Sequence, residues 1–195
     1  LEKYTLNLRP RLKAAGHDED FLNKTKSIAL VLEEFETSGL NGETDDSRYS
    51  DGPDKDSLTQ RWNNFWHGEA KEIKGGKDLG RRGMGKITYH LASSSSTIMA
   101  LSNQDGGKQN LLFGKCIFRK TYSFKTEYFN RHSFWCDTKK IGDDIQPIPI
   151  SDPLIINDFI KDFQLKRKDE SGTSWVIPHI DENKFTKSKI IKAIV

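Results

Sequence analysis

The stretch GGKDLGRRGMGK at residues 75–86 limits the fold of this chain more than any other, because it places five glycines and four basic residues in twelve positions. So many pliable residues predict a loop. Helical spacing begins immediately afterwards, with Met84, Ile87 and Leu91 on one side. A basic, glycine-rich loop therefore leads into a helix. It is either a solvated surface loop or a cradle for phosphate groups.

Composition narrows the class of protein. The chain has 195 residues, which suits one domain or a domain with a short appendage. A net charge of +3 is too weak to indicate nucleic-acid binding without other signals. Cys116 and Cys136 have no closely spaced partner, so we expect neither a disulfide framework nor a zinc site, and a reducing, cytoplasmic location fits. No apolar run approaches the roughly 20 residues of a membrane span.

The apolar pattern predicts an alternation of strands and helices, with no prediction for residues 119–150. Strands are expected at 4–8, 27–35, 96–102, 111–118 and 173–178, the third and fourth forming a hairpin. Helices are expected from about 56 to 70, after 84, over 153–163 behind a Ser-Asp-Pro start, and after Thr186.

The glycine-rich loop does not match a phosphate loop of the G-x-x-x-x-G-K-[ST] type. Gly80, Gly85 and Lys86 fit that pattern, but Ile87 stands where a hydroxyl would bind magnesium. Gly80-x-x-Gly83-x-Gly85 directly before a helix suggests another geometry. Unpaired N–H groups at a helix start favour an anion, and glycines let the main chain approach it closely.

Two further segments favour a nucleotide. Residues 30–42, LVLEEFETSGLNG, read as a strand that ends in acids and continues into Gly39 and Gly42. A carboxylate there could accept a hydrogen bond from the exocyclic amine of a base, and a glycine would let the ring lie against the backbone. Residues 170–178 lead Thr173 into a strand, where its hydroxyl would complete a polar cluster. Each segment by itself is more often a turn or a solvated strand edge. The case for a nucleotide site therefore rests on the order of these segments along the chain.

That order resembles the ATP-binding fold of the GHKL superfamily, which includes gyrase, heat-shock chaperones, sensor histidine kinases and mismatch-repair MutL proteins. More narrowly, the chain is similar to bacterial heat-shock-chaperone-like ATP-binding proteins through EEFETSGLNG, FWHGEAKEIKGGKDLGRRGMGK and HLASSSS. The resemblance implies an α/β fold of the Bergerat type, a two-layer α/β sandwich in which helices cover one face of a mixed sheet. The nucleotide would lie between that face and the helices.

The resemblance implies two groups of ATP-binding residues. Glu34 takes the place of the adenine-binding aspartate, which adds one methylene, and Glu36 stands where many members have glycine. The adenine group comprises Glu34, Thr37, Gly39, Leu40 and Thr173, and the lid over the phosphates comprises Gly80, Arg81, Gly83, Met84, Gly85 and Lys86.

The resemblance also implies ATP and Mg²⁺ as ligands, slow ATP hydrolysis in the full-length protein, and lid closure as a switch for a flanking domain or partner protein. No helix with the family's Glu…Asn box is recognisable upstream of Glu34. We therefore expect residues 1–182 to be an ATP-binding domain without its amino-terminal part, whose catalytic glutamate lies outside the chain. The chain by itself would be inactive, and residues 183–195 would begin a helix that leads to a further domain.

Two alternatives stay open. A degenerate member of the same fold would be a non-catalytic interaction module, which the changes at Glu34 and Glu36 favour. A nucleic-acid-binding domain would use the basic residues of 71–86 and the aromatic and basic segment 118–135. A homodimer is left open, no membrane partner is expected, and the scattered histidines predict no metal site.

Overall fold

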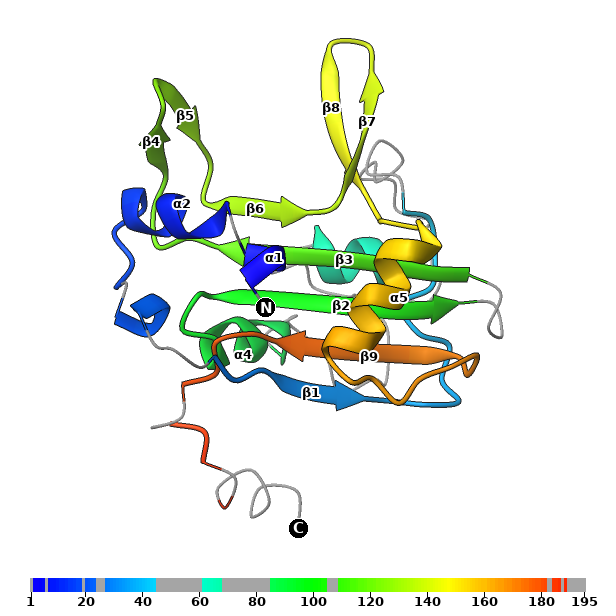
Figure 1. The fold of residues 1–195 in the computed structure, drawn as a ribbon. Helices are drawn as coiled ribbons and strands as arrows, with labels where there is room; N and C mark the ends of the chain where they lie inside the picture. Colours follow the sequence, from blue (N-terminus) through cyan, green and yellow to red (C-terminus); the bar gives the residue numbers. More distant parts are fainter. Residues whose placement is uncertain are drawn as a thin grey trace.

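An antiparallel sheet forms the centre of the molecule (Figure 1). The computed structural model describes residues 2–5, 7–18, 20–23, 27–44, 61–67, 85–104, 109–181, 184–186 and 188. Five strands pair in the order β1-β9-β2-β3-β6, and every neighbouring pair is antiparallel. They are β1 (Leu30–Glu33), β2 (Thr97–Gln104), β3 (Gln109–Ile117), β6 (His132–Trp135) and β9 (Gly172–Ile177).

Two hairpins rise beside the edge strand β6, one before it and one after it in the chain (Figure 1). The first pairs β4 (Tyr122–Phe124) with β5 (Glu127–Phe129), and the second pairs β7 (Asp137–Ile141) with β8 (Asp144–Ile148).

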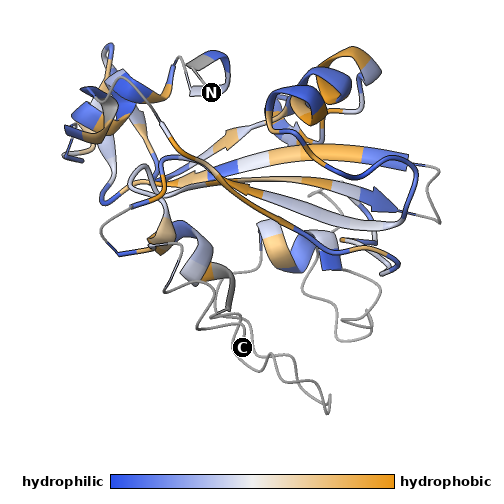
Figure 2. Ribbon diagram, turned by 60° about the horizontal axis from the view of Figure 1, so that its bottom comes forward, coloured by the Kyte–Doolittle hydropathy of each residue, from blue (hydrophilic) through white to orange (hydrophobic). Residues whose placement is uncertain are grey.

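Short helices lie on both faces of the sheet, as the turned view in Figure 2 shows. α1 and α5 cover one face, called here the α5 face, and α3 and α4 cover the other, the α4 face. The helices are α1 (Glu2–Thr5), α2 (Leu8–Ala14), α3 (Arg61–Trp66), α4 (Gly85–Ala92) and α5 (Pro153–Asp162), with a 3-10 turn at Asp20–Asn23.

The alternation of strand side chains builds a separate core on each face. All eight residues of β2 are buried, because helices cover both sides of this central strand. The α5-face core contains Tyr4, Met99, Leu101, Leu112, Ile156, Phe159 and Val176. The α4-face core contains Leu40, Trp62, Trp66, Ile98, Ala100, Phe113 and Trp175.

The predicted two-layer α/β sandwich, with helices on one face of a mixed sheet, is wrong. The sheet pairs are all antiparallel, strands dominate over the short helices, and both faces are covered. The physical reason is visible in β2, where apolar side chains of both parities are buried. A strand of that kind needs a layer on each side to remove its side chains from water.

Most individual elements agree with the predictions. β1, β2, β3, β9, α3, α4 and α5 fall within or next to the expected ranges, and Asp152 caps α5 by accepting a hydrogen bond from the Leu154 N–H at 2.8 Å. The strand predicted at 4–8 is wrong. Tyr4 lies in α1, where its ring packs edge-on against Phe159 at 5.5 Å. Of the helix predicted after Thr186, only Ser188 is described, and it is helical.

None of the helices that the structure describes is long and apolar enough to traverse a lipid bilayer.

A buried arginine joins the segment after α5 to the edge strand β1. Arg167 is 1% exposed, and its guanidinium donates to the Ser174 hydroxyl at 2.9 Å and to the Glu34 carbonyl. The Ser174 hydroxyl in turn donates to the Glu33 carboxylate at 2.8 Å. Because a buried cation is costly unless it is hydrogen-bonded, this network fixes the end of β1 against β9.

Gly172 allows the chain to pass close to the end of β1. Its φ is +128°, and an added Cβ would lie 2.3 Å from the Glu34 carbonyl oxygen. We expect Gly172→Ala to lower the free energy of unfolding by more than about 4 kcal/mol, measured by chemical denaturation. Gly142→Ala is the control, because its φ of +62° carries strain but no atom lies within 4 Å of the added Cβ. That variant should cost about 1 kcal/mol, and equal losses would contradict the close approach at Gly172.

His179, just after β9, is held in its neutral form. Its Nδ1 lies 2.7 Å from the Ser27 hydroxyl, and its ring packs against Phe21 at 5.1 Å. Burial is the main cause that lowers the pKa of His179 from 6.5 to about 4, with nearby positive charge adding to it.

The free energy of unfolding should therefore fall as pH drops from 6.5 towards about 4, since only the unfolded chain takes up this proton there. The loss from His179 is up to about 1.4 kcal/mol per pH unit. We expect His179→Gln, which does not titrate, to show a shallower slope than the wild type in denaturation experiments across this range. Identical slopes would show that His179 does not contribute.

Candidate functional site

The loop after β1 and the start of β9 meet at one corner of the sheet, called here the β1–β9 corner. The Glu34 N–H donates to the Thr173 carbonyl at 3.0 Å, which continues the ladder beyond the last residue of β1. The structure thus brings together two segments that lie far apart in the sequence and that were predicted to share a site.

Glu34 and Thr173 point to the same face of the sheet. Their chain neighbours Glu33 and Ser174 hydrogen-bond to each other and to the segment after α5, on the α5 face. Because successive side chains alternate, Glu34 and Thr173 face the opposite side, where α4 lies. Trp175, two residues after Thr173, packs in the α4-face core and confirms this direction.

The first turn of α4 is directed towards this corner. Near its C-terminal end, Ala92 packs in one cluster with Ile177, whereas Tyr89 stacks on Trp175 at 5.6 Å and 23°. The helix therefore runs in the same direction as β9, and Gly85 lies at the end directed towards the start of that strand. Burial, and to a lesser extent the charge of Glu34, raises the pKa of Tyr89, in keeping with this placement.

A tight loop follows Glu34. Thr37 Oγ1 donates to a Glu34 carboxylate oxygen at 3.3 Å and accepts from the Gly39 N–H at 3.4 Å. The Leu40 N–H donates to the buried Ser102 hydroxyl at 2.8 Å. Gly39 has a φ of +62°, and an added Cβ would lie 2.9 Å from that same hydroxyl oxygen. Glycine is therefore required at position 39 by both backbone and space.

Glu36 also has a left-handed backbone, with a φ of +59°. Glycine adopts this conformation at lower cost than any residue with a Cβ.

Thr173 carries an unusual hydroxyl. The residue is 0% exposed, and its Oγ1 has no hydrogen-bond partner among the described residues. An unsatisfied buried hydroxyl costs about 1–3 kcal/mol, so its presence calls for an explanation. Beside it, the carboxylate of Glu34 is exposed. The corner thus combines an acceptor and an unused donor, a pair that suits a ligand with both kinds of polar atom.

The predicted lid is described only in part. Gly85 and Lys86 form the first turn of α4, whereas Gly80, Arg81, Gly83 and Met84 lie outside the described residues. Of the predicted ATP-binding residues, the structure gathers Glu34, Thr37, Gly39, Leu40 and Thr173 at the β1–β9 corner.

The corner does not fit a magnesium site of its own. Within the described part of the chain, no group of three or more His, Cys, Asp or Glu residues is gathered as a metal centre. Glu34 is the carboxylate identified at the corner, and one carboxylate with a hydroxyl is a poor cage for Mg²⁺.

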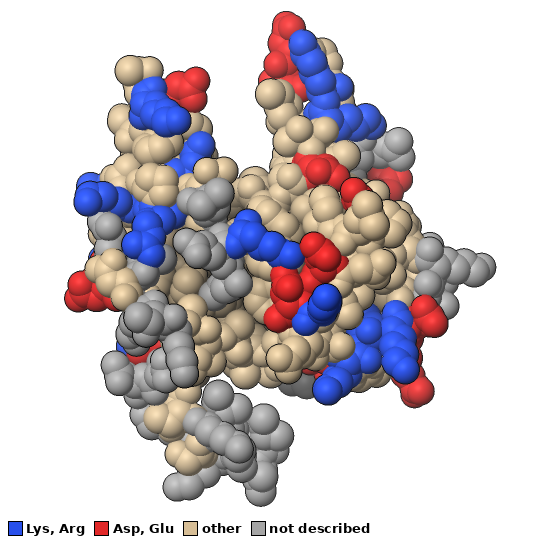
Figure 3. Space-filling model, in the orientation of Figure 1, with Lys and Arg blue, Asp and Glu red and all other residues tan. Residues whose placement is uncertain are grey.

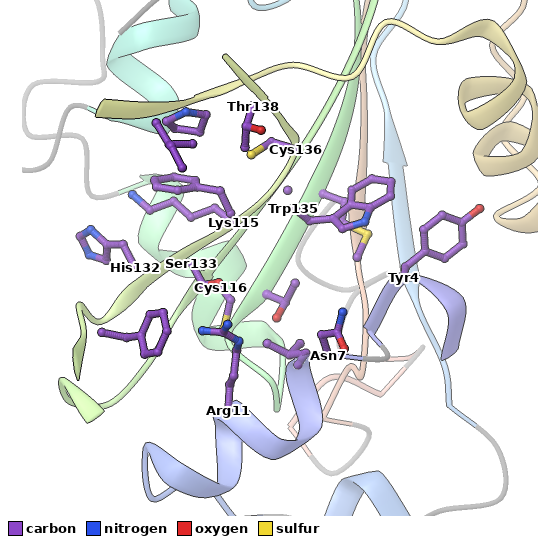
Figure 4. Close-up of a pocket in the computed structure, with 18 of the residues that line it drawn as sticks. Tyr4, Asn7, Arg11, Lys115, Cys116, His132, Ser133, Trp135, Cys136 and Thr138 are labelled. Atoms are coloured by element: carbon purple, nitrogen blue, oxygen red, sulfur yellow. The ribbon is translucent and has the colours of Figure 1, made fainter. Parts of the chain in front are cut away.

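A cleft of about 560 Å³ lies along the other edge of the sheet, beside β6 (Figure 4). None of the predicted ATP-binding residues that the structure describes lines it. Cys116 and Cys136 border it as free thiols, and burial raises their pKa values to about 12 and about 11. Thiols that stay protonated at neutral pH are weak nucleophiles, and burial keeps both of these in that form.

Sequence reasoning missed three residues at the corner, namely the stacked pair Tyr89 and Trp175 and the buried Arg167. Tyr89 lies four residues after Gly85, and Trp175 two after Thr173, so helix and strand periods would have placed them near the site. Arg167 gave no signal, because its burial depends on how the chain returns after α5.

Comparisons with protein families, with curated proteins and with solved structures gave no match for this chain. The chemistry of the β1–β9 corner therefore rests on its own geometry.

The unused hydroxyl of Thr173 predicts an unusual response to substitution. Thr173→Val exchanges it for a methyl group, and we expect the free energy of unfolding to rise by about 1 kcal/mol in the absence of ligand. Thr97→Val is the matched control, because Thr97 is also a buried strand residue but its Oγ1 donates to the Ser95 carbonyl at 3.1 Å. That variant should lose about 1 kcal/mol. Chemical denaturation measures both, and destabilisation of Thr173→Val would mean that its hydroxyl has a partner.

Proposed function

We propose that the β1–β9 corner binds the adenine ring of ATP. The observation that carries this proposal is the pairing of an exposed carboxylate, on Glu34, with a buried and unused hydroxyl, on Thr173, on one face of adjacent strands. Adenine offers an exocyclic amine and ring nitrogens that are acceptors. The Glu34 carboxylate would accept from the amine, and the Thr173 hydroxyl would donate to the ring.

The loop around Gly39 gives the corner a fixed wall. Hydrogen bonds from the Gly39 and Leu40 N–H groups hold the loop against Thr37 and Ser102. Gly39 is buried, and the Ser102 hydroxyl and the Asn103 carbonyl fill the space that its Cβ would take, so the loop packs closely on β2. Unpaired N–H groups at the start of α4, which is directed towards the corner, would favour the phosphates.

The proposal concerns binding first. Hydrolysis needs a base that orients water, and in this arrangement the Glu34 carboxylate is engaged by the adenine amine. The slow Mg²⁺-dependent hydrolysis that the resemblance implies would require a second carboxylate, and we do not assign one to the described residues.

The alternative is an interaction module of the same corner that binds no nucleotide. In that case the Thr173 hydroxyl would face a partner protein or stay unsatisfied, and ATP would leave the thermal stability of the chain unchanged. Titration with ATP decides between the two.

Isothermal titration calorimetry with ATP tests the proposal. We expect saturable binding that weakens about tenfold or more in Glu34→Ala and in Thr173→Val, since each removes one hydrogen bond to the base. GTP should bind more weakly than ATP, because its carbonyl would meet the Glu34 carboxylate. Glu127→Gln, on the exposed strand β5, is the control and should bind as the wild type does. Equal affinity in all four proteins, or no binding to the wild type, would reject adenine recognition at this corner.

A further inference from the structure

The outer edge of β6 is free of any described strand. β6 is the last strand in the sheet order and pairs only with β3 among the described strands. The Phe118 N–H donates to the Arg131 carbonyl at 2.7 Å, which fixes the alternation of hydrogen-bonded pairs along the two strands. Phe134, which lies opposite Lys115, falls in a non-hydrogen-bonded pair. Its N–H and C=O therefore point outward from the sheet.

The two hairpins flank this edge. The β4–β5 and β7–β8 hairpins stand up on either side of β6, and Figure 3 shows the surface hollowed between them. The cleft of about 560 Å³ lies at this place. It is lined from both faces of β6, by Ser133 and Trp135 on one and by Phe134 on the other. A cleft bordered by both faces of a strand lies at its edge, where another strand would add.

The charge of the cleft is one-sided. Its lining holds Lys3, Arg11 and Lys115, and no Asp or Glu is found among the lining residues that the structure describes. Lys3 is neutralised by Asp158 and Asp162, at 3.1 and 2.7 Å. Lys115 donates to the backbone inside the protein and is buried.

Of these three basic residues, Arg11 is the one whose charge is available to a ligand. Its guanidinium extends from α2 into the cleft (Figure 4) and lies 4.4 Å from the centre of the Phe129 ring and 5.3 Å from that of Phe124. It donates to the Tyr122 hydroxyl at 3.0 Å, and no carboxylate pairs with it within the described ranges. A guanidinium has five N–H donors, so several remain for a bidentate contact with a carboxylate.

We infer that the cleft receives an extended, acidic peptide segment of a partner protein. The segment pairs its main chain with the outer edge of β6 at Phe134 and places a carboxylate on Arg11. Backbone hydrogen bonds supply affinity in this mode, and alternate side chains supply selectivity. This inference is independent of nucleotide binding at the opposite edge of the sheet.

Two other occupants fit less well. Single-stranded nucleic acid needs open ring faces, but Phe129 stacks on Tyr122 at 19° and Trp135 stacks on Phe159 at 25°. A second copy of the chain joined edge to edge would bring two Arg11 guanidinium groups to the same cleft, and like charges repel there.

Selection of random twelve-residue peptides displayed on phage, against the full chain, tests the inference. We expect enriched sequences that alternate apolar residues with Asp or Glu. A synthetic peptide of the enriched sequence should lose about tenfold or more in affinity, by fluorescence anisotropy, for Arg11→Gln. Arg9→Gln is the matched control, because Arg9 lies on the same helix, hydrogen-bonds to Asn23 and does not line the cleft. Its affinity should equal that of the wild type.

Two changes to the peptide complete the design. Exchange of its acidic residues for Gln should abolish the difference between wild type and Arg11→Gln, which separates loss of the ion pair from damage to the fold. N-methylation of every second backbone nitrogen can begin at an odd or at an even residue of the peptide. One of these two sets faces β6, and its methylation should abolish binding. Peptides without acidic enrichment, equal loss in Arg9→Gln, unchanged binding after N-methylation in either phase, displacement by an oligothymidylate, or a dimer in sedimentation would each overturn the inference.

Discussion

Burial of β2 on both faces is the constraint on which the rest of the structure depends. Its eight residues are all buried, so each face of the sheet needs its own covering layer. The α5 face obtains one from α1 and α5, and the α4 face from α3 and α4. The covers are short, and much of the apolar contact is supplied by large rings such as Trp62, Trp66 and Phe159, which bury more area per residue than aliphatic side chains.

Pairing of β9 between β1 and β2 places the proposed nucleotide site. The antiparallel ladder sets Glu34 against Thr173 and sets Ser102 against Thr173 on the other side. Three polar residues, one just after β1 and two from the adjacent strands β9 and β2, thus meet at one end of an otherwise apolar face. Thr37 and Gly39 are held by hydrogen bonds within the loop, and the Leu40 N–H ties the loop to the Ser102 hydroxyl of β2, which gives the corner a defined shape without long helices.

Short sequence patterns predicted most individual helices and strands. They were wrong where contacts between residues far apart in the sequence determine the structure. The short apolar runs in β1, β2, β3 and β9 and the helical spacing in α4 and α5 were sufficient to find these elements. Tyr4 was assigned to a strand because its neighbours alternate, but its ring is buried by α5 and no strand pairs with it. The segment 119–150 gave no clear period because its strands are three to five residues long and mostly half-exposed.

The corner was predicted in outline for a similar reason. A strand ending in acids and a threonine opening another strand are local signals, and Glu34 and Thr173 do meet. The number of covering layers did carry a local signal that was overlooked, since the consecutive apolar residues at 98–101 leave neither face of β2 free for water. The role of Arg167 depends on a chain reversal that no short pattern encodes.

Glu34 makes interactions on both faces of the sheet. Its carbonyl is held by Arg167 from the α5 side, while its carboxylate is directed to the α4 side. A displacement of this one residue would pull on the segment that follows α5 and, through it, on the helix itself. At this corner the backbone of Glu34 is thus a covalent connection between the polar network on one face of the sheet and the proposed binding site on the other.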